Sequence, residues 1–449
     1  LKYWDFIMRT VNKQKVVIHR KRDKSLGLLE LIAIALGGMV GGGIFTVLGI
    51  SVAMIGVFTP IAFIIGGMLA MLASYSYIKM GVYYKDEGAT YSFFKRTFPN
   101  SSFAASLIGW WVIFGYISTL ALYAYTFASY AISGFEFANN EWIRKSVAGF
   151  IILIFTLINL WSVKGMGKLE DIMVYTKIII LAIISFVLIN NSNTTLPTLL
   201  QNDSDITLLS ILIVASLTFV AFEGFQLVIN AVNEMENPQK NIPRAIYGAI
   251  TLAMIIYIVL SFGAILAIPF EDIIKNEEYA LAAGAEKILG HWGTDLVIMG
   301  ALLATSSAIS GTLFGASRQM SVISQDGYFP KFLTKRTNNI PVHAIITMAI
   351  LAFSLIVIGN LKVILEFGSV TFLLVSFLMA YANFKIYKKT NSSLLLSIIA
   401  MLGLALGTML IIYYEFTTQI EQLYFIGGLY IVLTSFAFIY SKINQLKKF

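Results

Sequence analysis

Long, almost uncharged apolar stretches recur along the whole chain at regular intervals. A helix rises 1.5 Å per residue, so crossing a hydrocarbon core of about 30 Å takes about 20 apolar residues. The 449 residues are 58% hydrophobic and only 12% charged, whereas about 25% of the residues of a typical soluble domain are charged. This is too little polar surface to cover a water-exposed body of this size. The pattern therefore predicts an all-α membrane protein.

The apolar stretches predict about twelve spans in a single transmembrane domain, 1–449. The expected limits are 28–55, 58–83, 104–133, 147–164, 172–190, 207–232, 244–268, 294–323, 343–358, 361–388, 394–414 and 422–441. If both termini are cytoplasmic, 25 of the 32 Lys and Arg residues fall on cytoplasmic segments and 5 on external loops. Positive residues concentrate on the cytoplasmic side of membrane proteins. The bias supports this topology and explains the net charge of +8 through anionic lipid rather than nucleic acid.

Several classes of function are unsupported by the sequence. The chain has no cysteine, which excludes disulfides, thiol chemistry and cysteine metal sites. It has no G-x-x-x-x-G-K-[ST] loop for ATP, and His19, His291 and His343 lie near loops or span ends. A membrane-embedded enzyme would need paired catalytic groups that the spans do not offer. We expect a carrier or channel that is not an enzyme and needs no metal or cofactor.

The first span contains five glycines in seven positions, which are Gly37, Gly38, Gly41, Gly42 and Gly43. Each costs a helix about 1 kcal/mol relative to Ala, and irregular backbone at membrane depth occurs where it lines a cavity or is buried in protein. Freed N–H groups suit a carboxylate and freed carbonyls suit an ammonium group. The alternative is close helix packing through small residues. We favour a binding site, because transporter sites are typically built on broken helices.

A second break is expected five spans later, within 219–226. Gly224 lies there beside Glu223, a carboxylate in mid-membrane. Buried charges at this depth are costly and usually functional. Glu223 therefore has three open interpretations: a second proton site, a counter-charge for a cationic substrate, or a carboxylate paired across helices.

These segments resemble the amino acid–polyamine–organocation family of permeases. The resemblance rests on the glycine motif that ends in Gly43-Ile44-Phe45, on NEMENPQKNIPRAI at 233–246, on 317–330 and on DEGATY at 86–91. It covers about residues 25–390. It implies a leucine-transporter-type fold with broken first and sixth helices: a basic N-terminal segment (1–25), two inverted five-helix repeats (26–190 and 207–388) and two additional helices (394–441).

The resemblance also implies a substrate held between the first, third, sixth and eighth spans. The amides of Gly41, Gly42 and Gly43 would meet its carboxylate, and carbonyls near Met39, Val220 and Glu223 would meet its amine. The expected substrate-binding residues are Met39, Gly41, Gly42, Gly43, Val220, Phe222 and Glu223. Many family members have Ser or Ala at the position of Gly42 and an aromatic gate at that of Val220, so the pocket would be wider here.

Lys177 is the most informative charged residue inside a span. It could snorkel to the interface, as Lys79 is expected to do. Glu366 has two open interpretations, an outer-gate residue or a simply interfacial one, and we favour the second. In the fold implied by the resemblance, however, an ammonium group at the place of Lys177 would replace a sodium ion. The chain is similar to an archaeal proton-coupled, broad-specificity member of the family. That likeness implies that Lys177 contacts the Gly37 carbonyl and a hydroxyl of Ser306 or Ser307, and carries the coupled proton.

The predicted function is secondary active transport of amino acids across the plasma membrane, coupled to protons and independent of sodium. Amino acid/polyamine exchange is one alternative. A potassium-type cation transporter or channel is another, although no repeated filter motif is visible. The expected partners are an amino acid, protons and the lipid bilayer, with no obligate protein partner.

Overall fold

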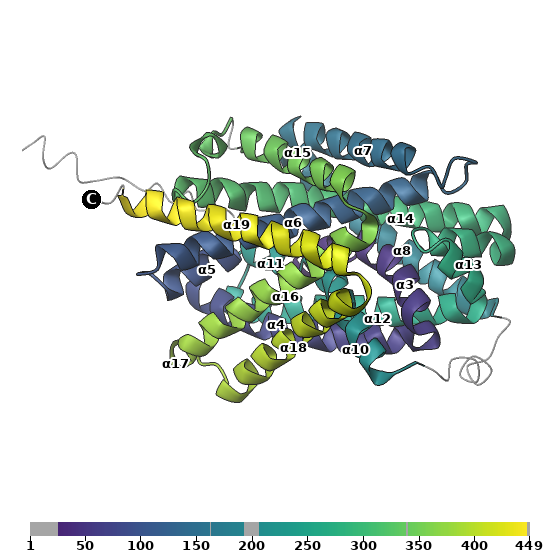
Figure 1. Cartoon of the computed structure of the whole chain (residues 1–449), viewed down its shortest axis with the longest axis horizontal. Helices are drawn as coiled ribbons and strands as arrows, with labels where there is room; N and C mark the ends of the chain where they lie inside the picture. The colour runs from purple at the N-terminus through teal and green to yellow at the C-terminus, as the bar shows by residue number, and fades with distance from the viewer. Residues whose placement is uncertain (1–25, 162, 193–205, 338–339, 447–449) are drawn as a thin grey trace, which may run out of the picture.

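The computed structural model of the protein describes residues 26–161, 163–192, 206–337 and 340–446. The predicted N-terminal segment 1–25 lies outside these residues, as does most of the loop 191–206. The described chain is helical, without a named strand. Most of its long helices run along the long axis of the molecule (Figure 1). The predicted all-α class is confirmed.

The described helices follow one another with short connections. Those of the first part are α2 (Leu28–Met39), α3 (Gly42–Ile55), η1 (Gly56–Phe58), α4 (Thr59–Tyr84), α5 (Ala89–Thr97), α6 (Ser102–Ala131), α7 (Glu141–Trp161) and α8 (Val163–Asn190). Those of the middle are α10 (Leu208–Thr218), η2 (Phe219–Phe222), α11 (Leu227–Asn230), α12 (Pro238–Ala267), α13 (Phe270–Lys275) and α14 (Ala280–Gln325). Those of the last part are η3 (Lys331–Thr334), α15 (Val342–Ile358), α16 (Leu361–Lys385), α17 (Tyr387–Thr390), α18 (Leu394–Thr418) and α19 (Ile420–Leu446).

Ten helical stretches of the described chain are long and apolar enough to cross a membrane. One of them, Gly42–Tyr84, contains both α3 and α4. Two shorter apolar helices are α2 and α15. The protein is therefore a multi-pass membrane protein, and the count of twelve separate crossings stays a prediction.

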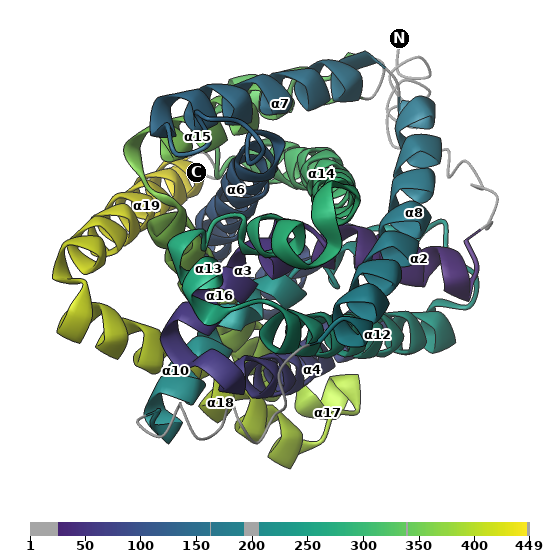
Figure 2. The same ribbon diagram turned by 90° about the vertical axis from the view of Figure 1, so that its right-hand side faces the viewer.

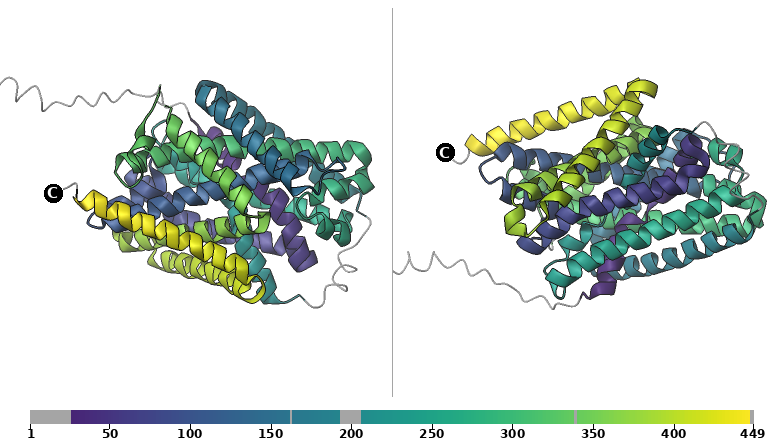
Figure 3. Two further views of the ribbon diagram at one scale, coloured as in Figure 1. Left: turned by 45° about the horizontal axis from the view of Figure 1, so that its top comes forward. Right: turned by 90° about the horizontal axis from the view of Figure 1, so that it is seen from below.

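Viewed along the bundle, α3 and α6 lie toward the middle, and α7, α8, α18 and α19 lie around the outside (Figure 2). The last two helices form one edge of the molecule (Figure 3). Large apolar side chains of the outer helices are exposed, among them Phe150, Leu157, Leu402 and Phe416. Because lipid is as apolar as these side chains, an outward apolar face is what a bilayer requires. The polar and broken segments therefore lie on the inner helices.

The two ends of the bundle are each held together by polar contacts. At one end, Oδ2 of Asp326 forms an ion pair with Nζ of Lys95 at 2.7 Å. The same oxygen accepts a hydrogen bond from the Tyr91 hydroxyl at 2.7 Å. At the other end, Arg144 pairs with Glu278, and Lys362 pairs with Glu277 at 3.2 Å. The first end carries loops predicted to be cytoplasmic, and the second carries loops predicted to be external.

This topology can be tested by cysteine labelling, since the chain contains no cysteine of its own. Glu136 and Asn100 are both exposed, in loops of opposite predicted side. We expect Glu136→Cys, and likewise a cysteine at position 203, to react with an impermeant reagent only from outside. Asn100→Cys should react only after the membrane is opened. The reverse pattern would contradict the proposed orientation.

Candidate binding site at two broken helices

The first helix is interrupted at Val40 and Gly41, within its glycine cluster. Helix α2 ends at Met39 and α3 begins at Gly42. Val40 has φ −82° and ψ 78°, and Gly41 has φ −124° and ψ −143°, so neither is helical. The Gly41 amide turns back to the Met39 carbonyl at 2.9 Å. The last carbonyls of α2 and the first amides of α3 thus face the interior of the protein.

The second interruption follows α10. The α-helix continues as the 3₁₀-helix η2, and the backbone of Glu223 is then extended, with φ −70° and ψ 142°. Gly224 has φ +122°, which only glycine adopts without strain. Helix α11 resumes at Leu227. The break therefore exposes backbone groups over about one turn beside Glu223.

The two breaks lie directly against each other. A Cβ on Gly224 would be 2.6 Å from the carbonyl carbon of Gly38, and one on Gly43 would be 2.9 Å from Cα of Ala221. The Tyr257 hydroxyl, from α12, lies 2.9 Å from the Met39 carbonyl oxygen and 2.8 Å from that of Ala221. One buried hydroxyl thus joins both breaks. Nothing in the sequence singled out Tyr257, because a tyrosine in an apolar span carries no pattern of its own.

The glycines of the first break also allow close helix packing. A Cβ on Gly41 would be 2.5 Å from Cβ of Ala308 in α14, and one on Gly42 would be 2.9 Å from Oγ1 of Thr126 in α6. The packing alternative is therefore realised at these positions. No acceptor for the amides of Gly42 and Gly43 occurs within the described part of the chain. These two N–H groups, at the N-terminus of α3, remain free to meet an anion.

Lys177 reaches the first break from α8. Its Nζ donates to the Val40 carbonyl at 2.6 Å and the Gly37 carbonyl at 3.1 Å. It also donates to Ser307 Oγ of α14 at 3.2 Å. Of the two serines expected from the resemblance, Ser307 makes this contact, and Ser306 is only half-buried. Since Lys177 is fully buried, it does not snorkel to an interface.

Glu223 lies at the second break with one oxygen engaged. Its Oε2 accepts from Gln226 Nε2 at 2.8 Å, and the same amide group donates to the Tyr116 hydroxyl at 3.1 Å. Its Oε1 is buried and has no hydrogen-bond partner among the described residues. The pairing across helices therefore runs through a neutral amide, and no ion pair of Glu223 occurs in the described chain. A buried carboxylate oxygen with free lone pairs can accept from an amine.

The other expected substrate contacts are already partly occupied. The Met39 carbonyl accepts from Tyr257 and Gly41. The Val220 carbonyl accepts from the Glu223 amide at 3.2 Å. The Phe222 ring packs on that of Tyr257, with centroids 5.1 Å apart, and so lies on the α12 side of the break. Among the described residues, no partner occurs for the amides of Gly42 and Gly43 or for Oε1 of Glu223.

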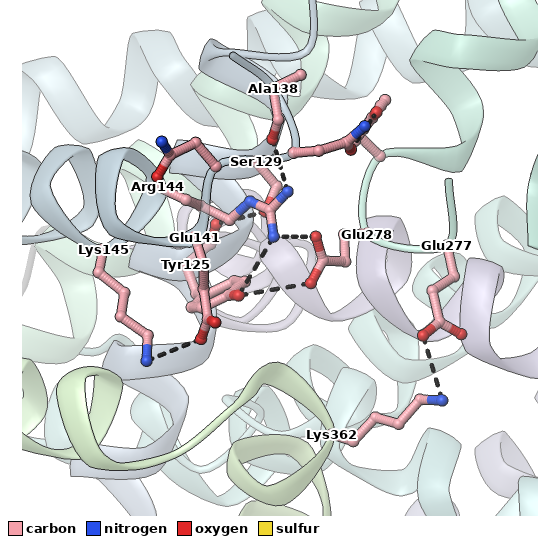
Figure 4. A network of polar contacts seen from close by, with 12 residues as sticks. Tyr125, Ser129, Ala138, Glu141, Arg144, Lys145, Glu277, Glu278 and Lys362 are labelled. Carbon is pink, nitrogen blue, oxygen red and sulfur yellow. Dashed lines mark hydrogen bonds and ion pairs between the residues drawn. The ribbon is translucent and has the colours of Figure 1, made fainter. Parts of the chain in front are cut away.

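The residues around the two breaks are enclosed by protein in this conformation. At the predicted external end, Arg144 bonds Glu278, the Tyr125 hydroxyl at 3.3 Å and the Ala138 carbonyl at 2.7 Å (Figure 4). Burial raises the pKa of Glu278 above its ordinary value, and the Arg144 charge opposes this. Residues around both breaks are buried, with exposures of 0% at Met39 and Val220 and 3% at Glu223. Access to the breaks therefore requires movement of the helices.

Comparison with known proteins places this chain in a family. The family model described as amino acid permease matches residues 26–441. The chain is 27% identical over 430 residues to the uncharacterized protein MJ0609 of Methanocaldococcus jannaschii, covering 94% of this chain and 97% of that protein. It is 30% identical over 353 residues to the inner membrane transport protein YbaT of Escherichia coli (78% and 81% covered). It is 24% identical over 402 residues to the branched-chain amino acid permease BcaP of Bacillus subtilis (82% and 84% covered). The chain therefore belongs to the amino acid permease family, within the amino acid–polyamine–organocation permeases, as its motifs predicted.

Proposed function

We propose that the protein is a secondary active transporter of amino acids in the plasma membrane, driven by protons and independent of sodium. The observation that carries this proposal is the ammonium group of Lys177 on the carbonyls of Gly37 and Val40, at the break itself. A sodium ion at such a place would need these same carbonyl oxygens. With a fixed cation already present, a coupled sodium ion is not required. Family membership supports amino acids as the substrates.

Proton coupling follows from the cost of burying an ammonium group. The charged form is stabilised here by carbonyl oxygens at the C-terminal end of α2, where the helix dipole is negative. If α2 or α14 moves, these oxygens leave, and a buried ammonium without them is unfavourable. Lys177 would then release its proton. Protonation of Lys177 would thus favour the conformation in which α2, α8 and α14 are held together.

The proposed arrangement is two inverted repeats of five spans, 26–190 and 207–388, followed by two additional helices, for twelve crossings. In support, two helices are interrupted, the first between α2 and α3 and the second between η2 and α11. They contact each other at Gly38 and Gly224. Inverted-repeat transporters bind their substrates where two such helices meet. No obligate protein partner is part of this proposal.

In the proposed binding mode, the substrate carboxylate meets the amides of Gly42 and Gly43, and the substrate amine meets Oε1 of Glu223. Both groups are unpartnered among the described residues, and they lie on the two breaks that contact each other. The site would open as the closed ends separate. Exchange of amino acids or polyamines, and potassium transport, are the alternatives. Binding of the purified protein to each of the twenty amino acids, to polyamines and to K⁺ would distinguish them, and binding of K⁺ alone would refute amino acid transport.

Glu223→Gln is expected to weaken substrate binding by about 10- to 100-fold, since a hydrogen bond to a charged group contributes about 1.5–3 kcal/mol. The Gln226 amide can still donate to the new amide oxygen, so the fold should persist. The measurement is equilibrium binding of a radiolabelled amino acid. Glu136→Gln changes an exposed carboxylate and should bind as the parent does. Unchanged affinity in Glu223→Gln would place the amine elsewhere.

A further inference from the structure

We propose that Glu366 of α16 and Glu415 of α18 form a second proton-binding site, in which the two carboxyl groups share one proton and thereby join the two helices. This site lies outside the broken helices and does not involve Lys177. It concerns a proton rather than the transported substrate. It therefore stands independently of the proposal that the substrate is an amino acid.

Both carboxyl groups are buried inside the protein and face each other. Glu366 is 3% exposed and Glu415 is 1% exposed. Helices α16 and α18 run antiparallel, with Asn383 Nδ2 donating to Ser397 Oγ at 3.4 Å and Leu373 packed beside Gly407, and the same register brings Glu366 beside Glu415. Within the described chain, Oε2 of Glu366 and both carboxyl oxygens of Glu415 have no donor. The Glu366 side chain is thus enclosed by protein, and its expected place at the membrane interface stays a prediction.

The position of Glu415 on its helix is not accidental. The buried residues of α18 form one inward stripe: Ser397, Ala400, Leu404, Gly407, Thr408, Ile411 and Glu415. The neighbouring residues Tyr413 and Phe416 are exposed. Glu415 is three residues from the end of α18 and could have been placed on the outer face, close to water. Instead the helix directs it inward against α16.

A shared proton resolves the electrostatics of the pair. Two ionised carboxylates offer only acceptors to each other and repel, which is costly in a low-dielectric interior. With one proton between them, one carboxyl donates to the other, and a single negative charge remains. A metal ion is a poorer fit, because no group of three or more His, Asp or Glu side chains suited to a metal occurs in the described chain.

Other charges near the pair are few. Lys362 lies one turn before Glu366 on α16 and is paired with Glu277 at 3.2 Å. Helices α6 and α10 contain no charged residue, and Glu421 of α19 is exposed. The remaining charged groups on elements packed against α16 lie toward its other end: Lys79, Lys95, Arg96, His343, Lys388, Lys389 and Lys442. Because Lys362 already pairs with Glu277, little positive charge is available to balance two ionised carboxylates at Glu366 and Glu415.

The pair is placed to act on the second break through α16. Two residues before Glu366, the Ile364 carbonyl accepts from Ser118 Oγ of α6 at 2.6 Å. Two residues after it, a Cβ on Gly368 would be 3.4 Å from the Val220 side chain. Loss of the shared proton would separate α16 from α18 by charge repulsion and disturb these contacts. Protons at this end of the bundle would thus control how α16 closes against Val220.

Infrared difference spectroscopy of the purified, membrane-reconstituted chain tests the proposal directly. The C=O stretch of a protonated carboxyl is separate from the bands of ionised carboxylates and shifts in D₂O. We expect such a band in the parent protein at a pH where exposed carboxyls are ionised. It should be lost in Glu366→Gln and in Glu415→Gln separately, because the new amide donates in place of the proton. The same donated hydrogen bond should keep each variant folded.

Glu421→Gln is the matched control, since it removes an exposed carboxylate of the neighbouring helix, and it should leave the band intact. Absence of the band from the parent protein overturns the proposal whether or not the variants fold. So does a band that either single variant retains at full amplitude. Loss of the band on adding Na⁺ or K⁺ at constant pH would show a cation site instead and would also overturn it.

Discussion

Lys177→Ala is expected to lose amino acid accumulation driven by a pH gradient, while substrate binding persists. The variant removes a fully buried lysine side chain and leaves the carbonyls of Gly37 and Val40 without the ammonium group. No side chain then carries a proton between the open and closed states at this site. Uptake by the variant should stop at the level reached when the amino acid merely equilibrates across the membrane without a proton gradient. The measurement is uptake into proteoliposomes with an inward proton gradient and no sodium.

Two controls make this result specific. Lys177→Met keeps most of the buried volume but not the charge, and it should behave as Lys177→Ala does if the proton is what matters. Lys79→Ala removes another lysine within a helix, one that contacts the Asn391 carbonyl at 2.7 Å, and it should retain gradient-driven uptake. Full accumulation by Lys177→Ala would refute the coupling role. An absolute sodium requirement in the parent protein would refute it as well.

Gly42→Val is expected to abolish substrate binding, with affinity lowered by more than about 100-fold. A Cβ at this position would lie 2.9 Å from Thr126 Oγ1 and 3.1 Å from Cα of Tyr123. The added side chain therefore presses α3 away from α6 and displaces the amides that would hold the carboxylate. Overpacking of this kind costs about 1–3 kcal/mol, which a stable helical bundle can tolerate. Binding of a labelled amino acid to purified protein is the measurement.

Gly427→Val is the matched control, because a Cβ on this α19 glycine would have no atom within 4 Å. The same chemical change in an open position should leave binding intact. Thermal unfolding of both variants separates loss of the site from loss of the fold. If Gly42→Val binds substrate as tightly as the parent, the carboxylate is not held at the start of α3.

The structure specifies how a side chain at Gly42 acts. Glycine at a binding site generally allows close approach of a ligand to the backbone, which a side chain would block. The structure shows that its Cβ would point at α6, so the effect acts through helix packing. The direction of a Cα–Cβ bond depends on the rotation of the broken helix about its own axis. No sequence pattern specifies that rotation.

The sequence by itself determined the membrane class, the family and the positions of the two breaks. These follow from local properties: span length matches bilayer thickness, glycine clusters weaken helices, and the motifs at 233–246 and 317–330 are specific. It also drew attention to Lys177 and Glu223, because a charge within an apolar span is conspicuous.

Only the tertiary structure decided what those residues meet. Tyr257 bonds to both breaks across more than 30 positions of sequence, and Glu415 faces Glu366 from a helix that carries none of the motifs. Each pairing joins residues far apart in the chain, and an isolated Tyr or Glu on one helix does not reveal which helix will face it. The physical reason is that the hydrophobic effect has no direction. It determines that an apolar helix inserts into the membrane. The relative rotation and contact of two helices come from the fit of their side chains, which exists only once both are packed.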